Sequence, residues 1–185
     1  LSRHWDSSLP HDDTYLSSCS PVYENLAYAA ATKGLCFDLF LVADEREAYS
    51  DLATLKYLAL LTGGNLFIYD VYRGTLPQDL YKQLSEPSAM SCLVRLRTSP
   101  GFSVHTVDGH CCPDDTYDNL YHLAGCDVNT CLAVEFEYAS SGGFRSHPEI
   151  PPVIQLALSY TTLTGAHRVR LLTFTASVAR STQQI

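Results

Sequence analysis

Cysteine and histidine residues, the side chains that most often bind zinc, gather between positions 105 and 131 of this 185-residue sequence. They are His105, His110, Cys111, Cys112, His122, Cys126 and Cys131. Structural zinc sites usually take paired ligands that stand two to four residues apart. Here Cys111 and Cys112 are adjacent, and adjacent side chains on an extended chain point to opposite sides. We therefore interpret these residues as loop and strand side chains and predict no metal site, with a zinc-dependent module as the weaker alternative.

Carboxylates form two clusters, Asp44-Glu45 with Glu47 and Asp114-Asp115 with Asp118. Neither cluster has the glycine and ligand spacing of an EF-hand calcium loop, so we interpret both as solvated acidic loops. The sequence also lacks a G-x-S-x-G nucleophile elbow, a G-x-x-x-x-G-K-[ST] phosphate loop, a G-x-G-x-x-G motif and an H-E-x-x-H motif. We therefore predict that the protein has no catalytic residues and is not an enzyme.

Two arginines, Arg95 and Arg97, stand two positions apart in a run of alternating residues at 91–98. Residues two apart on a strand share a face, so both guanidinium groups would project to the same side. Isolated surface charges of this kind usually have little energetic effect. Two arginines on one face can instead hold a carboxylate-bearing peptide through paired hydrogen bonds, which lysine does less well. This pair is the candidate binding site.

The elements that must position these residues change in kind near Pro87. Before Pro87, helical patterns occur at 21–31, 50–61 and 76–84, and apolar strand-like runs occur at 35–42 and 65–71. Pro21 suits the first turn of a helix, and Gly63 suits a helix end. The continuous apolar run at 35–42 predicts a strand buried on both faces. Strand, helix and strand in this order indicate a parallel pair and the α/β class.

After Pro87 the helical pattern disappears, and short runs with turn residues between them predict strands. The predicted strands are 91–98, 102–107, 131–138, 153–162 and 168–176, with a hairpin at 165–167. Five short strands indicate an antiparallel sandwich or barrel. We therefore divide the chain into a polar lead-in at 1–21, an α/β part at 22–86 and a β part at 87–185.

Composition excludes several classes of protein. Apolar residues make up 46 % of the chain and charged residues 17 %, which excludes a disordered tail or a coiled coil. The net charge of −8 is unfavourable for binding nucleic acid. No apolar run approaches the roughly 20 residues of a membrane span, so any membrane role would be peripheral. Seven cysteines without a C-x-x-C pair, and a polar start without a signal peptide, favour a reducing, cytoplasmic compartment.

Four blocks of the sequence, in order, resemble the inner-coat proteins of COPII vesicles, the Sec23/Sec24 family. The blocks are FDLFLV, SDLATLKYLALLTGGNLFIY, LVRLRTSPGF and LALSYTTLTGAHRVRLLTF. The resemblance runs from about residue 22 to residue 179. It implies that the α/β part is the C-terminal half of a von Willebrand A-like trunk domain and that the β part belongs to a β-sandwich, or β-barrel, domain. The family's zinc ribbon has no counterpart here, so we expect a partial chain without a cofactor.

The family has two branches, a cargo-binding adaptor and its GTPase-activating partner. The adaptor typically shows R-[VI]-R-[TC]-[ST]-x-G-[FL] at the first sandwich strand, and residues 95–102 (RLRTSPGF) depart from it only at Leu96. The partner branch tends there to have a Phe-Gly-Gly opening and an acidic residue, which Ser88-Ala89-Met90 and Arg95 do not match. We therefore favour the cargo adaptor, with the GTPase-activating subunit as the alternative.

For the adaptor branch, the resemblance implies that Arg95 and Arg97 contribute to the pocket that reads acidic or hydrophobic–acidic export signals. It also implies a heterodimer with the GTPase-activating subunit, contact with the coat's small GTPase, and binding of cargo and SNARE cytoplasmic tails. The implied location is cytoplasmic, peripheral to the membrane at endoplasmic reticulum exit sites and on COPII vesicles, with no nucleic acid as a partner.

Overall fold

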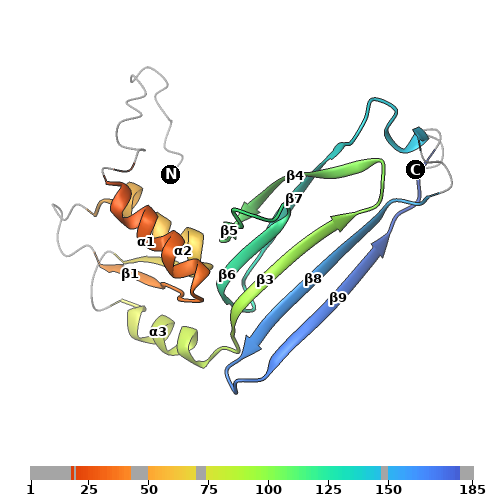
Figure 1. The fold of residues 1–185 in the computed structure, drawn as a ribbon. Helices are drawn as coiled ribbons and strands as arrows, with labels where there is room; N and C mark the ends of the chain where they lie inside the picture. The colour runs from red at the N-terminus through yellow and green to blue at the C-terminus, as the bar shows by residue number, and fades with distance from the viewer. Residues whose placement is uncertain (1–17, 19, 43–49, 70–73, 147–149, 180–185) are drawn as a thin grey trace, which may run out of the picture.

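The structure is a computed structural model that describes residues 18, 20–42, 50–69, 74–146 and 150–179 (Figure 1). Its first part is an α/β unit and its second part is built from antiparallel strands. The elements of the first part are α1 (Pro21–Thr32), β1 (Leu39–Val42), α2 (Leu52–Thr62), β2 (Leu66–Tyr69) and α3 (Leu76–Ser85). Within the described ranges, no helix is long and apolar enough to cross a membrane.

Strands β1 and β2 pair in parallel, as the sequence predicts, with Leu39 opposite Leu66. The prediction of a strand over 35–42 that is buried on both faces was wrong in length and in burial. The strand begins only at Leu39, and its residues are half-buried. The preceding backbone bonds to helix ends instead, since Leu35 donates its N–H to Ala30 O and Phe37 donates its N–H to Thr62 Oγ1.

Local signals at the helix ends account for α1 and α2. The Ser20 hydroxyl accepts the N–H of Val22 (3.3 Å), and the Asp51 carboxylate accepts the N–H of Thr54 (3.3 Å). Gly63 ends α2 with a φ of 78°, in the left-handed region that favours glycine. The predicted helix at 50–61 is therefore confirmed to within a residue or two.

The described residues of the second part form seven strands and one short 3-10 turn. They are β3 (Ala89–Thr98), β4 (Phe102–Gly109), β5 (Cys112–Pro113), β6 (Leu120–Cys126), β7 (Leu132–Tyr138), the turn at Gly143–Ser146, β8 (Val153–Thr162) and β9 (His167–Thr175). One sheet has the order β5-β6-β3-β8-β9, and β4 pairs with β7 in a second sheet. The predicted antiparallel class and the hairpin between β8 and β9 are confirmed.

The prediction of five strands missed β5 and β6. Strand β6 shows no alternation of apolar and polar residues because both of its faces are covered. Leu123 packs in the sandwich interior, while α1 and α2 lie against the strand, and Leu123 and Ala124 are each only 1 % exposed. A strand covered on both sides lacks the two-residue pattern that the prediction relied on.

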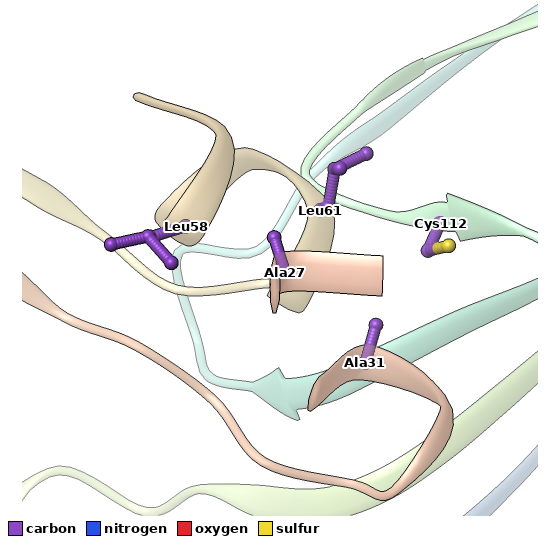
Figure 2. Packing of buried hydrophobic residues seen from close by; sticks show 5 residues of the cluster. All are labelled: Ala27, Ala31, Leu58, Leu61 and Cys112. Carbon is purple, nitrogen blue, oxygen red and sulfur yellow. The ribbon is translucent and has the colours of Figure 1, made fainter. Parts of the chain in front are cut away.

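Two apolar cores meet at the vicinal cysteines. Figure 2 shows the first core, formed by Ala27, Ala31, Leu58, Leu61 and Cys112. The second core lies inside the sandwich and contains Cys92, Val94, Cys111 and Leu123. The side chains of Cys111 and Cys112 therefore enter different cores, as expected for neighbours on an extended chain.

In contrast to the buried residues of these cores, the residues of strand β9 are exposed. It forms the edge of the five-stranded sheet, and all nine of its residues are exposed. Four of them are large and apolar, each between 62 and 64 % exposed: Val169, Leu171, Leu172 and Phe174. Val169 and Leu171 share one face and Leu172 and Phe174 share the other, so both faces of this strand carry exposed apolar surface.

Candidate functional site

Strand β3 presents the two candidate arginines from the middle of the five-stranded sheet, between β6 and β8. Its inward residues Cys92, Val94 and Leu96 are between 2 and 5 % exposed. Their packing holds the strand in place, and the residues between them occupy the opposite face. The structure thus places Arg95 and Arg97 side by side on one face, as predicted from their spacing.

Arg95 is half-buried against an aromatic ring. Its Cζ lies 5.8 Å from the centroid of the Tyr117 ring, within the range of a cation–π contact. In the strand register, Arg95 stands opposite Leu120 on β6 and Ala157 on β8. The guanidinium is therefore oriented by its neighbours without being neutralised by them.

Arg97 is exposed and stands opposite Gln155 on β8. Its Nη1 donates to Gln155 Oε1 over 3.4 Å, and Gln155 Nε2 donates to Thr173 Oγ1 over 3.4 Å. Both hydrogen bonds are long and therefore weak, so a ligand carboxylate can replace them at little cost.

Neither arginine has an ion-pair partner among the residues that the structure describes. The ion pairs found there join Lys82 to Glu86, His105 to Glu137 and His122 to Asp114. Two positive charges on one rigid face, with no carboxylate of the described residues within 4.0 Å, form an arrangement that can bind an anionic group.

The acidic loop is exposed at Asp115 and Asp118, as interpreted, whereas Asp114 is half-buried and hydrogen-bonded. Its Oδ2 lies 2.7 Å from His122 Nε2, and its Oδ1 accepts the N–H groups of Thr116 (2.9 Å) and Tyr117 (2.8 Å). The hydrogen bond with His122, followed by the two backbone bonds, lowers the pKa of Asp114. Asp114 therefore holds the turn that carries Tyr117 against Arg95.

A cavity of about 430 Å³ opens beside this turn and is lined in part by Asp114, Asp118, Tyr117 and Tyr121. Carboxylates and aromatic rings favour a cation, so this cavity has the opposite preference to the arginine face. An acidic ligand of the arginines would be repelled from this side and would approach over Arg97 and Gln155.

The residues considered as zinc ligands are dispersed. His105 pairs with Glu137, His122 pairs with Asp114, and His110 Nδ1 lies 2.6 Å from Gly64 O. The cysteines occupy two cores, a cavity wall and an exposed position: Cys112 the first core, Cys111 the second, Cys126 the wall, and Cys131 the exposed position. In the described part of the chain, no three His, Cys, Asp or Glu side chains are placed to share a metal ion. The cluster at Asp44, Glu45 and Glu47 lies outside the described residues.

Sequence reasoning missed Tyr117, which lies against Arg95, and Gln155, which accepts a hydrogen bond from Arg97. The segment from Asp114 to Tyr117 carries a local signal, since an aspartate that accepts backbone N–H groups two and three residues on is a common turn feature. No local signal indicates that this turn lies against β3, because that contact depends on the unpredicted strand β6.

Two family models together match nearly the whole chain. The Sec23/Sec24 trunk domain matches residues 2–86, and the Sec23/Sec24 beta-sandwich domain matches residues 89–179. The trunk match ends just after α3, and the sandwich match begins at the first residue of β3.

Relatives from both branches are similar to the chain. It is 42 % identical over 151 residues to protein transport protein SEC23 D of Arabidopsis thaliana, covering 81 % of this chain and 20 % of that protein. It is 30 % identical to human protein transport protein Sec24C, covering 80 % and 13 %. The crystal structure of the human COPII-coat protein Sec24c superposes with a TM-score of 0.77 at 26 % identity, covering 95 % of this chain and 23 % of that one. The chain thus spans about a fifth or less of the curated relatives' length.

Proposed function

The chain belongs to the Sec23/Sec24 family of COPII-coat proteins, and from this membership we propose that it is the cargo-recognition part of the coat's adaptor subunit. In this proposal, Arg95 and Arg97 bind the carboxylates of export signals in the cytoplasmic tails of cargo and SNARE proteins. The observation that carries it is the placement of both guanidinium groups on one face of a central strand, without an ion-pair partner in the described ranges.

The geometry suits a short acidic peptide. Hydrogen bonds to charged groups contribute about 1.5–3 kcal/mol each, and a rigid mount reduces the entropy lost on binding. The carboxylates of Asp114 and Asp118 lie on the Tyr117 side of the pair. The signal therefore lies over Arg97 and toward β8 and β9.

A charge-reversal experiment tests the site. The double variant Arg95→Glu/Arg97→Glu is compared with Arg168→Glu/Arg170→Glu, which makes the same charge change on the same sheet. Across the sheet, Arg95 pairs with Ala157 on β8, and Ala157 pairs with Leu171 on β9, so these three side chains share one face. Arg170 is the neighbour of Leu171 and pairs with Leu158, so the control pair lies on the other face.

We expect a fluorescent peptide with a hydrophobic–acidic signal to bind the first variant at least about tenfold more weakly, at both low and moderate salt. The control variant should bind it within about twofold of the parent protein. Equal binding by the parent and the Arg95/Arg97 variant at both salt concentrations would show that the site assignment is wrong.

The second candidate is the GTPase-activating subunit, which the 42 % identity to SEC23 D favours. That subunit stimulates GTP hydrolysis by the coat's small GTPase, whereas a cargo adaptor alone does not. Measuring GTP turnover with the purified protein as the only addition separates the two. A large stimulation would overturn the adaptor assignment, and a rate equal to that of the GTPase alone would support it.

The proposal also specifies partners and location. The adaptor would pair with the GTPase-activating subunit, contact the small GTPase and act in the cytoplasm, peripheral to the membrane at endoplasmic reticulum exit sites and on COPII vesicles. The division of the chain at 22–86 and 87–185 stays a prediction. A pull-down from cytosol should recover the GTPase-activating subunit in roughly equal amount, and failure where a known coat pair survives would contradict the pairing.

A further inference from the structure

The cavity of about 430 Å³ beside the turn before β6 takes no part in the proposed cargo site. Two tyrosine rings and two carboxylates line it, from Tyr117, Tyr121, Asp114 and Asp118. Among the described residues, no lysine or arginine lines this cavity. Its volume is in the range of ligand sites, and aromatic faces and carboxylates both attract a cation. The cavity therefore favours a positively charged group of the size of a side chain.

The two carboxylates of this cavity differ in what they already bind. Asp114 accepts the N–H groups of Thr116 and Tyr117, and its Oδ2 lies 2.7 Å from His122 Nε2. The hydrogen bond with His122 and then the backbone bonds lower the pKa of Asp114, so this carboxylate is ionised and fixed in place. Asp118 is exposed and has no ion-pair partner within the described ranges. Asp118 is therefore the carboxylate that a bound cation can pair with.

The cavity adjoins the arginine pair of the proposed cargo site. Tyr117 lines the cavity, and its ring centroid lies 5.8 Å from Arg95 Cζ. Leu120 also lines the cavity and stands opposite Arg95 in the register of β3 and β6. Cβ atoms of residues that stand opposite each other in this way are about 4.5–5.5 Å apart. A peptide with a carboxylate on Arg95 and Arg97 can therefore place a second side chain in the cavity.

The geometry of an extended peptide determines which residue that second side chain belongs to. Such a peptide advances about 3.3 Å per residue, and its side chains project alternately to opposite sides. The residue next to the acidic one therefore points away from the protein. The residue two positions from it lies about 7 Å along the peptide and points to the same side. A long basic side chain at that position can reach from Arg95 past Tyr117 to Asp118.

We propose that this cavity binds a lysine or arginine side chain of the export signal, two positions from the acidic residue that the arginine pair binds. This inference rests on the proposed cargo function and narrows its ligand class to signals with a basic and an acidic residue. A purely acidic signal is repelled by Asp114 and Asp118 and stays over Arg97. The added cation reverses that repulsion, and the peptide extends across Arg95 into the cavity.

Fluorescent peptides that differ at one position test the spacing. Each contains one glutamate, and lysine stands two positions before it, two positions after it, or directly beside it. Matched peptides carry glutamine in place of the lysine. At low salt, we expect lysine at a two-residue distance, in one of the two orders, to strengthen binding about fivefold over glutamine. Lysine beside the glutamate should give less than about a twofold gain. Equal gains at all three positions would contradict the cavity as the binding site of the lysine.

Variants of the acidic turn separate the cavity from general electrostatic attraction. Asp118→Asn should reduce the gain from lysine to less than about twofold. Asp115→Asn makes the same charge change in the same turn, but Asp115 is exposed and does not line the cavity, so the gain should remain. Asp118→Lys should reverse the preference, so that a second glutamate binds more tightly than lysine at the same position. Equal effects of Asp118→Asn and Asp115→Asn would overturn the proposal.

The arginine variant distinguishes failure of this inference from failure of the proposed function. If the glutamine peptides lose affinity with Arg95→Glu/Arg97→Glu but lysine gives no gain in the parent protein, the cargo site stands and the cavity proposal is wrong. If Arg95→Glu/Arg97→Glu binds all peptides as the parent does, while the gain from lysine still depends on Asp118, the arginine site is wrong and the cavity still binds the basic side chain. Loss of the gain at moderate salt in the parent protein supports an ionic contact, because salt screens exposed charges.

Discussion

The two faces of strand β3 are made from alternating residues of one ten-residue run, and they differ in what surrounds them. On the inward face, Cys92, Val94 and Leu96 are almost fully buried in the sandwich interior. On the outward face, Arg95 is half-buried, Arg97 is exposed, and neither is neutralised within the described ranges. The buried residues that stabilise the strand therefore alternate with the arginines of the proposed cargo site, so each face can be altered alone.

The largest effect should come from the inward face. Replacing Leu96 by alanine removes buried methyl groups and leaves a cavity, which should lower the free energy of unfolding by about 2–5 kcal/mol. Leu96→Met conserves volume and should cost less than about 1.5 kcal/mol. Urea denaturation followed by circular dichroism measures both. A loss below about 0.5 kcal/mol for Leu96→Ala would remove the distinction between the faces.

The outward face should respond in binding and not in stability. Arg97→Lys keeps the charge but loses the planar donor fork, so affinity for an acidic signal peptide should fall about three- to tenfold. Its free energy of unfolding should stay within about 0.5 kcal/mol of the parent, as for other exposed positions. Fluorescence anisotropy and urea denaturation on the same samples test this pair of expectations. Unchanged affinity would mean that only net charge matters at Arg97.

A smaller effect tests whether Tyr117 orients Arg95. Tyr117→Leu keeps apolar bulk but removes the aromatic ring. It should lower the free energy of unfolding by about 0.5–1 kcal/mol. A double-mutant cycle with Arg95→Met isolates the interaction between the two side chains. A coupling energy of zero would show that the ring only covers the arginine.

The smallest effect concerns acid stability at the edge of the outward face. The folded state lowers the pKa of Asp114, so this group contributes stability above the ordinary carboxyl pKa of about 4. That contribution is lost as the pH falls through the lower folded value. The difference in thermal midpoint between the parent and Asp114→Asn should therefore be constant above about pH 5 and shrink below pH 4. A constant difference down to pH 2 would contradict the assignment.

Elements with local signals were predictable from the sequence. Helix α2 has a side-chain cap at Asp51 and a left-handed glycine at Gly63, and both act within one turn of the helix. Strand β3 shows a two-residue alternation because its two faces have different surroundings. The shared face of Arg95 and Arg97 followed from that alternation alone.

Elements whose character depends on distant contacts were not predictable. Strand β6 has apolar residues on both faces because helices cover one side and the sandwich interior the other. The apolar run before Leu39 stays outside the strand because its backbone bonds to the ends of α1 and α2. Tyr117 reaches Arg95 only through the turn that precedes β6. One short motif also does not decide between the two branches, because relatives of both branches match the same chain.

The opposite burial of Cys111 and Cys112 has a mechanical consequence for the junction between the two parts. One side chain is embedded in the sandwich and the next in the α/β unit. Asp127 reinforces the junction by accepting a hydrogen bond from Asn65 over 3.1 Å, and Gly63 lies against the carbonyl of Gly125. A force that separates the two parts must therefore pull either Cys111 out of the sandwich core or Cys112 out of the core of the α/β unit. Tension therefore passes from one part to the other without a hinge, and the pair should rupture as one body under load.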